Sequence, residues 1–162
     1  MSNPVQSTSP VKADTKLSKA QVSIRPASEA DIGFIFNSWL KSYKQSSFAK
    51  YVPNPVYFDH HHKAIELLLK RSKVLVACNP ADNNQIYGYL VHETVQETSV
   101  VHYCYTKEAF RKMGILQLLL SEAKLPEAFF YSHSTVSGSF VIPKLKHNPV
   151  YNPYLAFTEL KV

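Results

Sequence analysis

The stretch YTKEAFRKMGIL, residues 105–116, joins a predicted strand to a predicted helix. Two cations, Arg111 and Lys112, stand just before Gly114, and a leucine-rich run follows. A helix N-terminus exposes unpaired backbone N–H groups and the positive end of the helix dipole, and glycine lets a ligand approach the backbone closely. The pattern indicates a phosphate or pyrophosphate site. A plain glycine at a strand-to-helix turn, beside a solvated basic loop, is the alternative.

The composition predicts a soluble globular domain, because the 162 residues are 45% hydrophobic and 19% charged. No apolar run approaches the ~18 residues of a membrane span. The N-terminus lacks a positive region followed by an apolar one, so we expect no secretory signal. Cys78 and Cys104 lie in apolar strand-like runs and form no close-spaced metal or redox motif. We therefore expect a reducing, cytoplasmic location.

The formal net charge of +6 permits an anionic partner, either nucleic acid or a phosphorylated small molecule. The lysines are scattered over most of the chain, so the sequence contains no dedicated nucleic-acid face and nucleic acid is not the expected partner. A basic surface that only aids solubility is equally compatible with this charge. The sequence makes no prediction about the oligomeric state.

Local patterns predict the order of elements in the domain. Residues 1–20 are rich in Ser, Thr, Pro and Lys and predict a flexible tail, which leaves residues 21–162 as a single domain. We expect strands at 22–26, 73–80, 86–94, 99–106 and 128–133, a last strand near 155–160, and helices after Ser28, from Asn54 to about Arg71, and between Leu116 and Pro126.

The first helix has the clearest signals. Ser28 followed three residues later by Asp31 is a capping-box pattern. Apolar side chains then recur at helical spacing and predict the buried face of this helix. These residues are Ile32, Ile35, Phe36, Trp39 and Tyr43.

The motif RKMGIL, residues 111–116, resembles the pyrophosphate loop of GCN5-related N-acetyltransferases, Q/R-x-x-G-x-G/A. Arg111 matches its first position and Gly114 its central glycine, whereas Leu116 departs from its final small residue. VSIRPASEADIGFIF, residues 22–36, resembles the first strand and helix of these enzymes. The element order from residue 22 to about 133 is also similar, and the chain further resembles small, phage-encoded members of the group.

The resemblance implies an α/β (α+β) fold with a mixed, mostly antiparallel central sheet, flanked by helices and splayed between strands four and five. Acetyl-coenzyme A would lie in that cleft, and an amine, on a small molecule or a protein, would attack its thioester. The cofactor-binding residues implied are Tyr103, Cys104 and Tyr105 for the pantetheine arm and Arg111, Lys112, Met113, Gly114, Ile115 and Leu116 for the pyrophosphate.

The same resemblance implies a base that removes the amine's proton and an acid for the thiolate. Glu93 and His102 are the candidate bases, and His102 is expected to project to the face opposite Val101 and Tyr103. A half-buried strand histidine bonded to backbone is the alternative for His102. Tyr131 is the candidate acid, with core filling as its alternative, because residues 134–142 contain no tyrosine.

Two further features bear on function. In DHHHK, residues 59–63, successive side chains on a helix point about 100° apart, so His60, His61 and His62 do not predict a metal site. Leu116 and a short C-terminal region, which lacks a long fourth helix and a closing strand pair, leave a second interpretation open. In that interpretation the chain is catalytically inactive and acts as a structural or interaction module.

Overall fold

The structure, a computed structural model, describes residues 17–157. Over this range the strands are β1 (Ser23–Pro26), β2 (Lys73–Asn79), β3 (Asp82–Val95), β4 (Thr98–Thr106), β5 (Ala128–Tyr131) and β6 (Asn148–Tyr151). The helices are α1 (Glu29–Tyr43), α2 (Asn54–Arg71), α3 (Ile115–Glu122) and α4 (Val136–Val141). Short 3-10 turns lie at Lys19–Gln21, Glu108–Phe110, Ile142–Lys144 and Pro153–Ala156.

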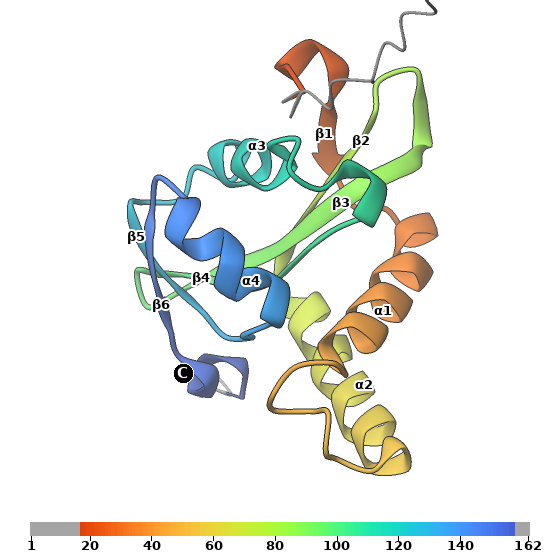
Figure 1. Cartoon of the computed structure of the whole chain (residues 1–162), viewed down its shortest axis with the longest axis vertical. Coiled ribbons are helices and arrows are strands. Elements are labelled where there is room, and N and C mark those ends of the chain that lie inside the picture. Colours follow the sequence, from red (N-terminus) through yellow and green to blue (C-terminus); the bar gives the residue numbers. More distant parts are fainter. Residues whose placement is uncertain (1–16, 158–162) are drawn as a thin grey trace, which may run out of the picture.

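The strands form one sheet in sequence order, and helices lie on both of its faces (Figure 1). Neighbours from β1 to β4 are antiparallel, whereas β4–β5 and β5–β6 are parallel. The connection from β4 to β5 runs through α3, and the connection from β5 to β6 runs through α4. This arrangement confirms the expected fold class, a mixed and mostly antiparallel sheet flanked by helices.

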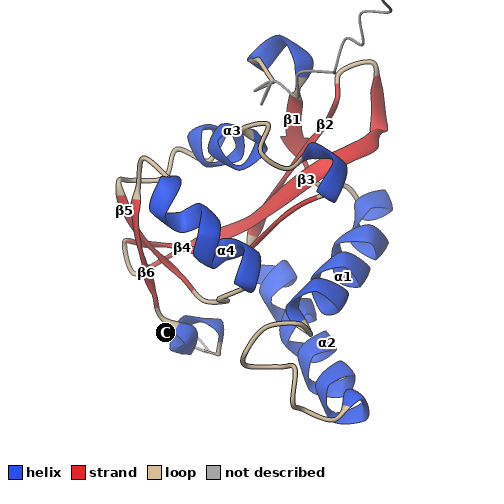
Figure 2. Cartoon of the chain, viewed as in Figure 1, coloured by secondary structure: helices blue, strands red, loops and turns tan. Residues whose placement is uncertain are grey.

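The sheet separates two hydrophobic cores. Helices α1 and α2 cover one face, where Trp39 and Ile65 pack on Val91 and its neighbours. Helix α3 covers the other face (Figure 2). On this face Leu119 packs with Leu90 and its neighbours. Burial of apolar area on both faces is what holds the helices to the sheet.

The helix starts follow the sequence signals closely. Ser28 N–H donates to Asp31 Oδ2 at 2.7 Å, which confirms the capping box of α1. The Asp31 carboxylate also receives two hydrogen bonds from Arg25, of 2.7 and 3.0 Å, and this guanidinium lowers the pKa of Asp31 to about 2. Helix α2 spans Asn54–Arg71, the expected range, and its N-cap is Pro53.

The C-terminal end differs from the prediction. The last described strand is Asn148–Tyr151 rather than 155–160; Pro153–Ala156 form a 3-10 turn, and residues 158–160 lie outside the described residues. Asn148 N–H donates to the Glu127 carbonyl, just before β5, and Asn152 N–H donates to the Tyr131 carbonyl of β5. Pro149 between them therefore faces the open edge, where it needs no N–H.

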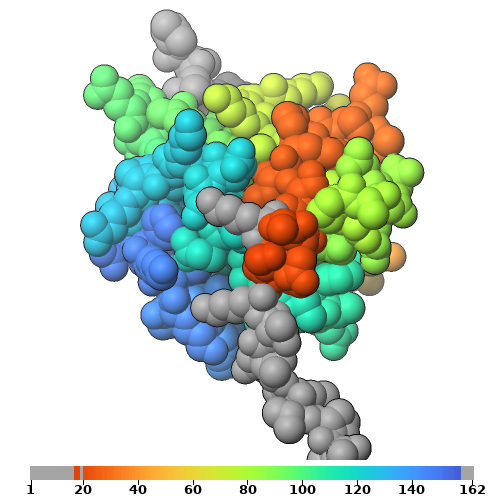
Figure 3. All heavy atoms as spheres, turned by 90° about the horizontal axis from the view of Figure 1, so that it is seen from above, coloured from red at the N-terminus to blue at the C-terminus, as the bar shows by residue number. Residues whose placement is uncertain are grey.

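The predicted tail, residues 1–20, lies mostly outside the described residues. Its last residues are described: Leu17 N–H donates to the Met113 carbonyl at 2.9 Å, and the Leu17 side chain packs against the core beneath α3. Figure 3 shows the start of the described chain, in red, against the turquoise-green surface of the segment before α3. The division into a tail and one domain, residues 21–162, stays a prediction.

Candidate functional site

A β-bulge in β4 places His102. Val91 pairs with Tyr103 and His92 with Val101, so His102 is an extra residue in β4. Val101 therefore packs in the core beneath α3, while Tyr103 packs in the core beneath α1 and α2. The expectation that Val101 and Tyr103 share one face is wrong, because it assumed the unbroken alternation of a regular strand.

The sheet splays directly after the bulge. Strand β5 pairs with β4 only at Val100–Phe130 and Val101–Tyr131, and Ser132 N–H then donates to the Val101 carbonyl at 3.1 Å. From His102 to Thr106, β4 pairs with β3 alone among the described strands. The backbone of β4 is therefore open on the side of β5, as the expected splay requires.

The loop from β4 to α3 offers a row of backbone donors. Lys112 and Gly114 have φ angles of 63° and 81°, in the left-handed region. Within residues 17–157, the backbone N–H groups of residues 112–117 have no acceptor, and Leu118 is the first to donate back, to the Gly114 carbonyl at 3.1 Å. Such a row at the positive end of α3 suits a phosphate group.

Arg111 and Leu116 flank this row differently. The exposed Arg111 side chain donates from Nε to the Thr106 carbonyl at 3.2 Å, so its guanidinium is held at the end of β4. Leu116 is half-buried and packs against the core beneath α3. The residue that departs from the family motif is thus turned toward the interior.

An apolar cavity of about 60 Å³ lies where β4 and β5 separate. Helix α4 crosses this part of the sheet (Figure 1) and contributes Gly138 and Val141 to the cavity wall. The volume is far below the ~300–1,000 Å³ of typical ligand pockets, so α4 closes the cleft in this structure. The other lining residues include Val101, His102, Tyr103, Cys104, Leu116, Leu120, Phe129, Tyr131 and His133.

A chain of hydrogen bonds, here called the polar chain, runs through the protein beside this cavity. Glu93 Oε1 lies 3.0 Å from Arg71 Nε and 2.7 Å from His102 Nε2. His102 Nδ1 lies 2.7 Å from Ser132 Oγ, which lies 2.9 Å from His133 Nδ1. Glu93, His102, Ser132 and His133 are 7, 1, 3 and 8% exposed.

The donors and acceptors of the polar chain follow from its ends. Glu93, paired with Arg71, is an ionised acceptor, so His102 Nε2 must carry a hydrogen and His102 Nδ1 must accept one from the Ser132 hydroxyl. Ser132 Oγ then accepts from His133 Nδ1–H. This assignment leaves Nε2 of His133 without a hydrogen, and His133 is one of the residues that line the cavity.

Burial keeps both histidines of the chain neutral at pH 7. It lowers the pKa of His102, although the hydrogen bond that His102 donates to Glu93 acts in the opposite direction. It lowers the pKa of His133 well below the ordinary range, and the neighbouring His61 and His102 lower it further. Burial also raises the pKa of Tyr131.

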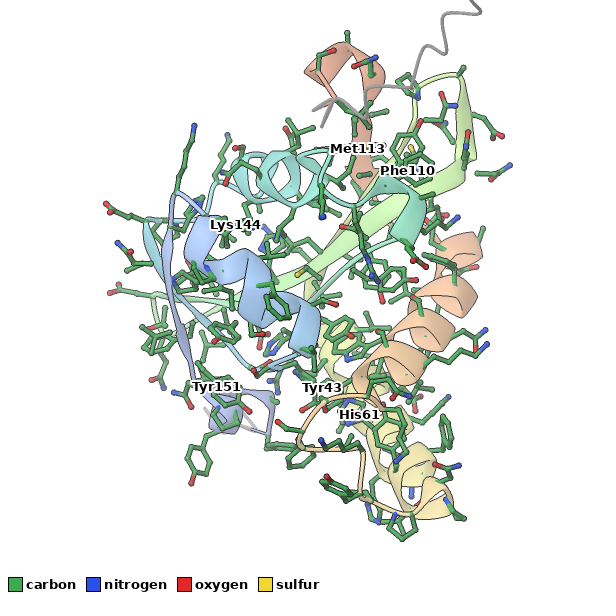
Figure 4. The ribbon with its side chains drawn as sticks, viewed as in Figure 1. Tyr43, His61, Phe110, Met113, Lys144 and Tyr151 are labelled. Atoms are coloured by element: carbon green, nitrogen blue, oxygen red, sulfur yellow. The ribbon has the colours of Figure 1, made fainter. Side chains whose placement is uncertain are left out.

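Aromatic rings enclose His133 on the side of α1 and α2. Its ring centroid lies 5.3 Å from Trp39, 4.7 Å from Tyr43 and 5.2 Å from His61. Figure 4 shows Tyr43 and His61 side by side where α1 meets α2, and their rings stack at 4.7 Å. His133 therefore joins the aromatic core to the cavity.

The structure brings together two of the three predicted catalytic residues. Glu93 and His102 are directly hydrogen-bonded. Tyr131 lines the same cavity as His102, and no hydrogen bond joins Tyr131 to either of them in the described part of the chain. Sequence reasoning missed Arg71, Ser132 and His133. The available signal for the last two was their position directly after β5, beside the expected splay.

The three consecutive histidines of α2 do not converge. His61 points inward, between Tyr43 and Tyr57, whereas His60 and His62 are exposed. Among residues 17–157, no group of three His, Cys, Asp or Glu is placed to hold a metal ion. No helix in the same range has the length and apolar character needed to cross a membrane.

Protein-family models and curated protein sequences give no match to the chain. Solved structures do. The "putative acetyl transferase from Pyrococcus furiosus" is 18% identical with a TM-score of 0.52, over 88% of this chain and 85% of that one. A "possible acetyltransferase" from Clostridium difficile 630 is 15% identical with a TM-score of 0.47, over 81% and 78%. PaiA N-acetyltransferase from Thermoplasma acidophilum, in complex with coenzyme A, is 16% identical with a TM-score of 0.45, over 64% and 69%.

Of these three likenesses, the one to the Pyrococcus structure establishes the fold. Its TM-score of 0.52 extends over most of both chains, and the strand order with its β4–β5 splay is the one that the sequence resemblance implied. The chain therefore has the fold of GCN5-related N-acetyltransferases.

Proposed function

We propose that this chain binds acetyl-coenzyme A and transfers its acetyl group to an amine. The observation that carries the proposal is the row of unpaired N–H groups at residues 112–117, beside the opening between β4 and β5. A pyrophosphate would accept these hydrogen bonds and lie at the positive end of α3. The exposed cations Arg111 and Lys112 add to the attraction.

The pantetheine arm would pair with the open backbone of β4. Tyr103, Cys104 and Tyr105 supply this backbone, and no β5 partner occupies it in the described structure. The side chains of Tyr103 and Tyr105 are committed to the core beneath α1, so their part in binding is through N–H and C=O groups. Cys104 contributes its side chain to the cavity wall.

The chemistry would take place at the cavity, where the amine attacks the thioester carbonyl. The Glu93–His102 pair is the proposed final acceptor of the amine's proton. Tyr131 is the proposed acid for the thiolate, because its raised pKa keeps the phenol protonated at neutral pH. Holding amine and thioester together supplies several kcal/mol of the acceleration. Each proton-transfer residue then adds about 10²–10⁴-fold.

We propose that the acceptor amine belongs to a small molecule or a protein. We also propose a cytoplasmic location. Both described cysteines are free thiols, which suits a reducing compartment. The similarity to phage-encoded members stays a prediction from the sequence resemblance.

A thiol-release assay on a panel of amines and peptides tests the proposed reaction. Wild type is compared with Glu93→Gln, His102→Ala and Tyr131→Phe. Acetylated product, with losses of about 10²–10⁴-fold in the variants, supports the proposal. Turnover that all three variants keep within about twofold means that other groups move the protons.

A second candidate function is binding without catalysis. The observation that favours it is the small cavity of about 60 Å³, which α4 closes. A wild-type protein that binds acetyl-coenzyme A but acetylates no acceptor would be a structural or interaction module built on this fold.

A further inference from the structure

We infer that His133 takes the proton of the attacking amine and that Ser132 passes it to the His102–Glu93 pair. The inference rests on the proposed function, and it gives a catalytic role to His133 and a relay role to Ser132, which the family resemblance did not select. Its basis is that the polar chain begins at the cavity and ends at a carboxylate.

The geometry requires an intermediary between the amine and His102. Both ring nitrogens of His102 are occupied, Nε2 by Glu93 and Nδ1 by Ser132, each at 2.7 Å. The His102 ring cannot bond an amine without breaking one of these contacts. His133 lines the same cavity, and only its Nδ1 is engaged in the polar chain, 2.9 Å from Ser132 Oγ. We therefore place the amine in the cavity beside His133, whose Nε2 is the ring nitrogen outside the polar chain.

The proton balance closes along the polar chain. As the C–N bond forms, the nitrogen gives a proton to His133 Nε2. His133 Nδ1 passes its own hydrogen to Ser132 Oγ, and the Ser132 hydroxyl hydrogen moves to His102 Nδ1. The result is an imidazolium at His102 beside the Glu93 carboxylate, while Ser132 and His133 regain their neutral forms.

The surroundings explain why the charge does not stay on His133. Trp39 and Tyr43 of α1, His61 of α2, and Tyr103 and His102 of β4 face its ring. None of these groups is negatively charged at neutral pH, so an imidazolium there is unpaired and desolvated. At His102, Glu93 supplies the missing negative charge, with the Arg71 cation on the far side of that carboxylate.

The same chain can reset itself. When the C–S bond breaks, coenzyme A leaves as a thiolate, whose ordinary pKa of about 8.5 exceeds the ~6.5 of an imidazole. Transfer of the stored proton from His102 back through Ser132 and His133 is therefore downhill, whether it reaches the sulfur directly or the Tyr131 phenolate that remains after this phenol has protonated the sulfur. Over one turnover the polar chain gains and loses one proton, and no further reactant is needed.

The test combines kinetics in mixtures of H2O and D2O with Ser132→Ala, which breaks the chain without adding atoms. We expect wild-type kcat to depend on the D2O fraction along a curve, because several protons move together. Ser132→Ala should lower kcat by about 10²-fold and make the dependence linear, while acetyl-coenzyme A affinity stays within about twofold. Ser121→Ala, at an exposed serine of α3, should match wild type.

The outcomes separate this inference from the proposed function. If wild type does not bind acetyl-coenzyme A in calorimetry, the proposed function fails and the inference with it. If wild type turns over with a linear D2O dependence, or if Ser132→Ala keeps kcat within about twofold, the inference alone is wrong. The inference is also contradicted if wild type binds acetyl-coenzyme A but releases no thiol with any amine or with water as the acetyl acceptor. The wild-type measurement decides even if Ser132→Ala does not fold.

Discussion

Gly88 lies where β3 and β4 are close together. It pairs with Thr106, and a Cβ at this position would lie 2.3 Å from the Tyr105 carbonyl oxygen, a backbone atom with little freedom to move. The glycine therefore fixes the distance between β3 and the open end of β4. The two strands could not keep this register around a larger residue.

Replacing Gly88 by alanine should therefore destabilise the fold by about 1–3 kcal/mol, the usual cost of overpacking. Gly33→Ala is the matched control, because nothing lies within 4 Å of a Cβ at that position of α1, and alanine should add up to about 1 kcal/mol of helix stability. Urea denaturation measures both. Equal midpoints for Gly88→Ala and wild type would show that β4 can shift freely.

His61 makes the fold sensitive to acid. Its ring is 7% exposed, and burial lowers its pKa from 6.5 to about 4. The unfolded chain takes up this proton near pH 6.5, whereas the folded chain does so only near pH 4. The free energy of unfolding should therefore fall as the pH drops between these values, and His102 and His133 act in the same direction.

The measurement is a series of urea titrations between pH 7 and pH 4. His61 alone should contribute about 3 kcal/mol to the loss, and His61→Phe, which keeps an aromatic ring between Tyr43 and Tyr57 but takes up no proton, should flatten the profile. If His61→Phe loses as much unfolding free energy between pH 7 and pH 4 as wild type does, groups other than His61 cause the acid sensitivity.

At the scale of elements, local patterns were sufficient for α1 but not for the ends of the sheet. The spacing of Ile35, Trp39 and Tyr43 needs only the helical period, and all three are buried. The bulge at His102 and the strand at Asn148–Tyr151 depend on partners distant in the sequence, β3 and β5. No local pattern reports such pairings.

The candidate site divides in the same way. The glycine and cations at residues 111–114 are visible in a local motif, because a strand, a turn and a helix start follow one another there. The link from Glu93 to His102, Ser132 and His133 joins β3 and β4 to the residues that follow β5. Residue types alone therefore select Glu93 and His102 without revealing how they connect to the cavity.

Helix α4 is the element that must move when the cofactor binds. It is six residues long and contains no buried residue, while the cavity that it closes has only about 60 Å³. Because a pantetheine arm needs a larger space, we predict faster amide exchange at residues 136–144 when acetyl-coenzyme A is bound. The interior of α2 should be unchanged. If protein saturated with acetyl-coenzyme A shows no change in amide exchange at residues 136–144, the cofactor binds elsewhere.

At the scale of the whole molecule, the sheet brings two separate features to one opening. The N–H row lies at the start of α3 on one side of the sheet, and the polar chain reaches the cavity from the side of α1 and α2. Only the separation of β4 from β5 lets both meet one extended ligand. The bulge at His102 lies where this separation begins, and the histidine there is bonded to both Glu93 and Ser132.

The most direct test of this account is a calorimetric titration of wild type, Gly114→Ala and Gly33→Ala with acetyl-coenzyme A. Gly114 has a φ of 81°, and alanine there costs about 1–2 kcal/mol unless the N–H row shifts. We predict saturable one-to-one binding by wild type and Gly33→Ala, and at least about tenfold weaker binding by Gly114→Ala. Absence of binding by folded wild-type protein, or equal affinities for all three, would contradict the account.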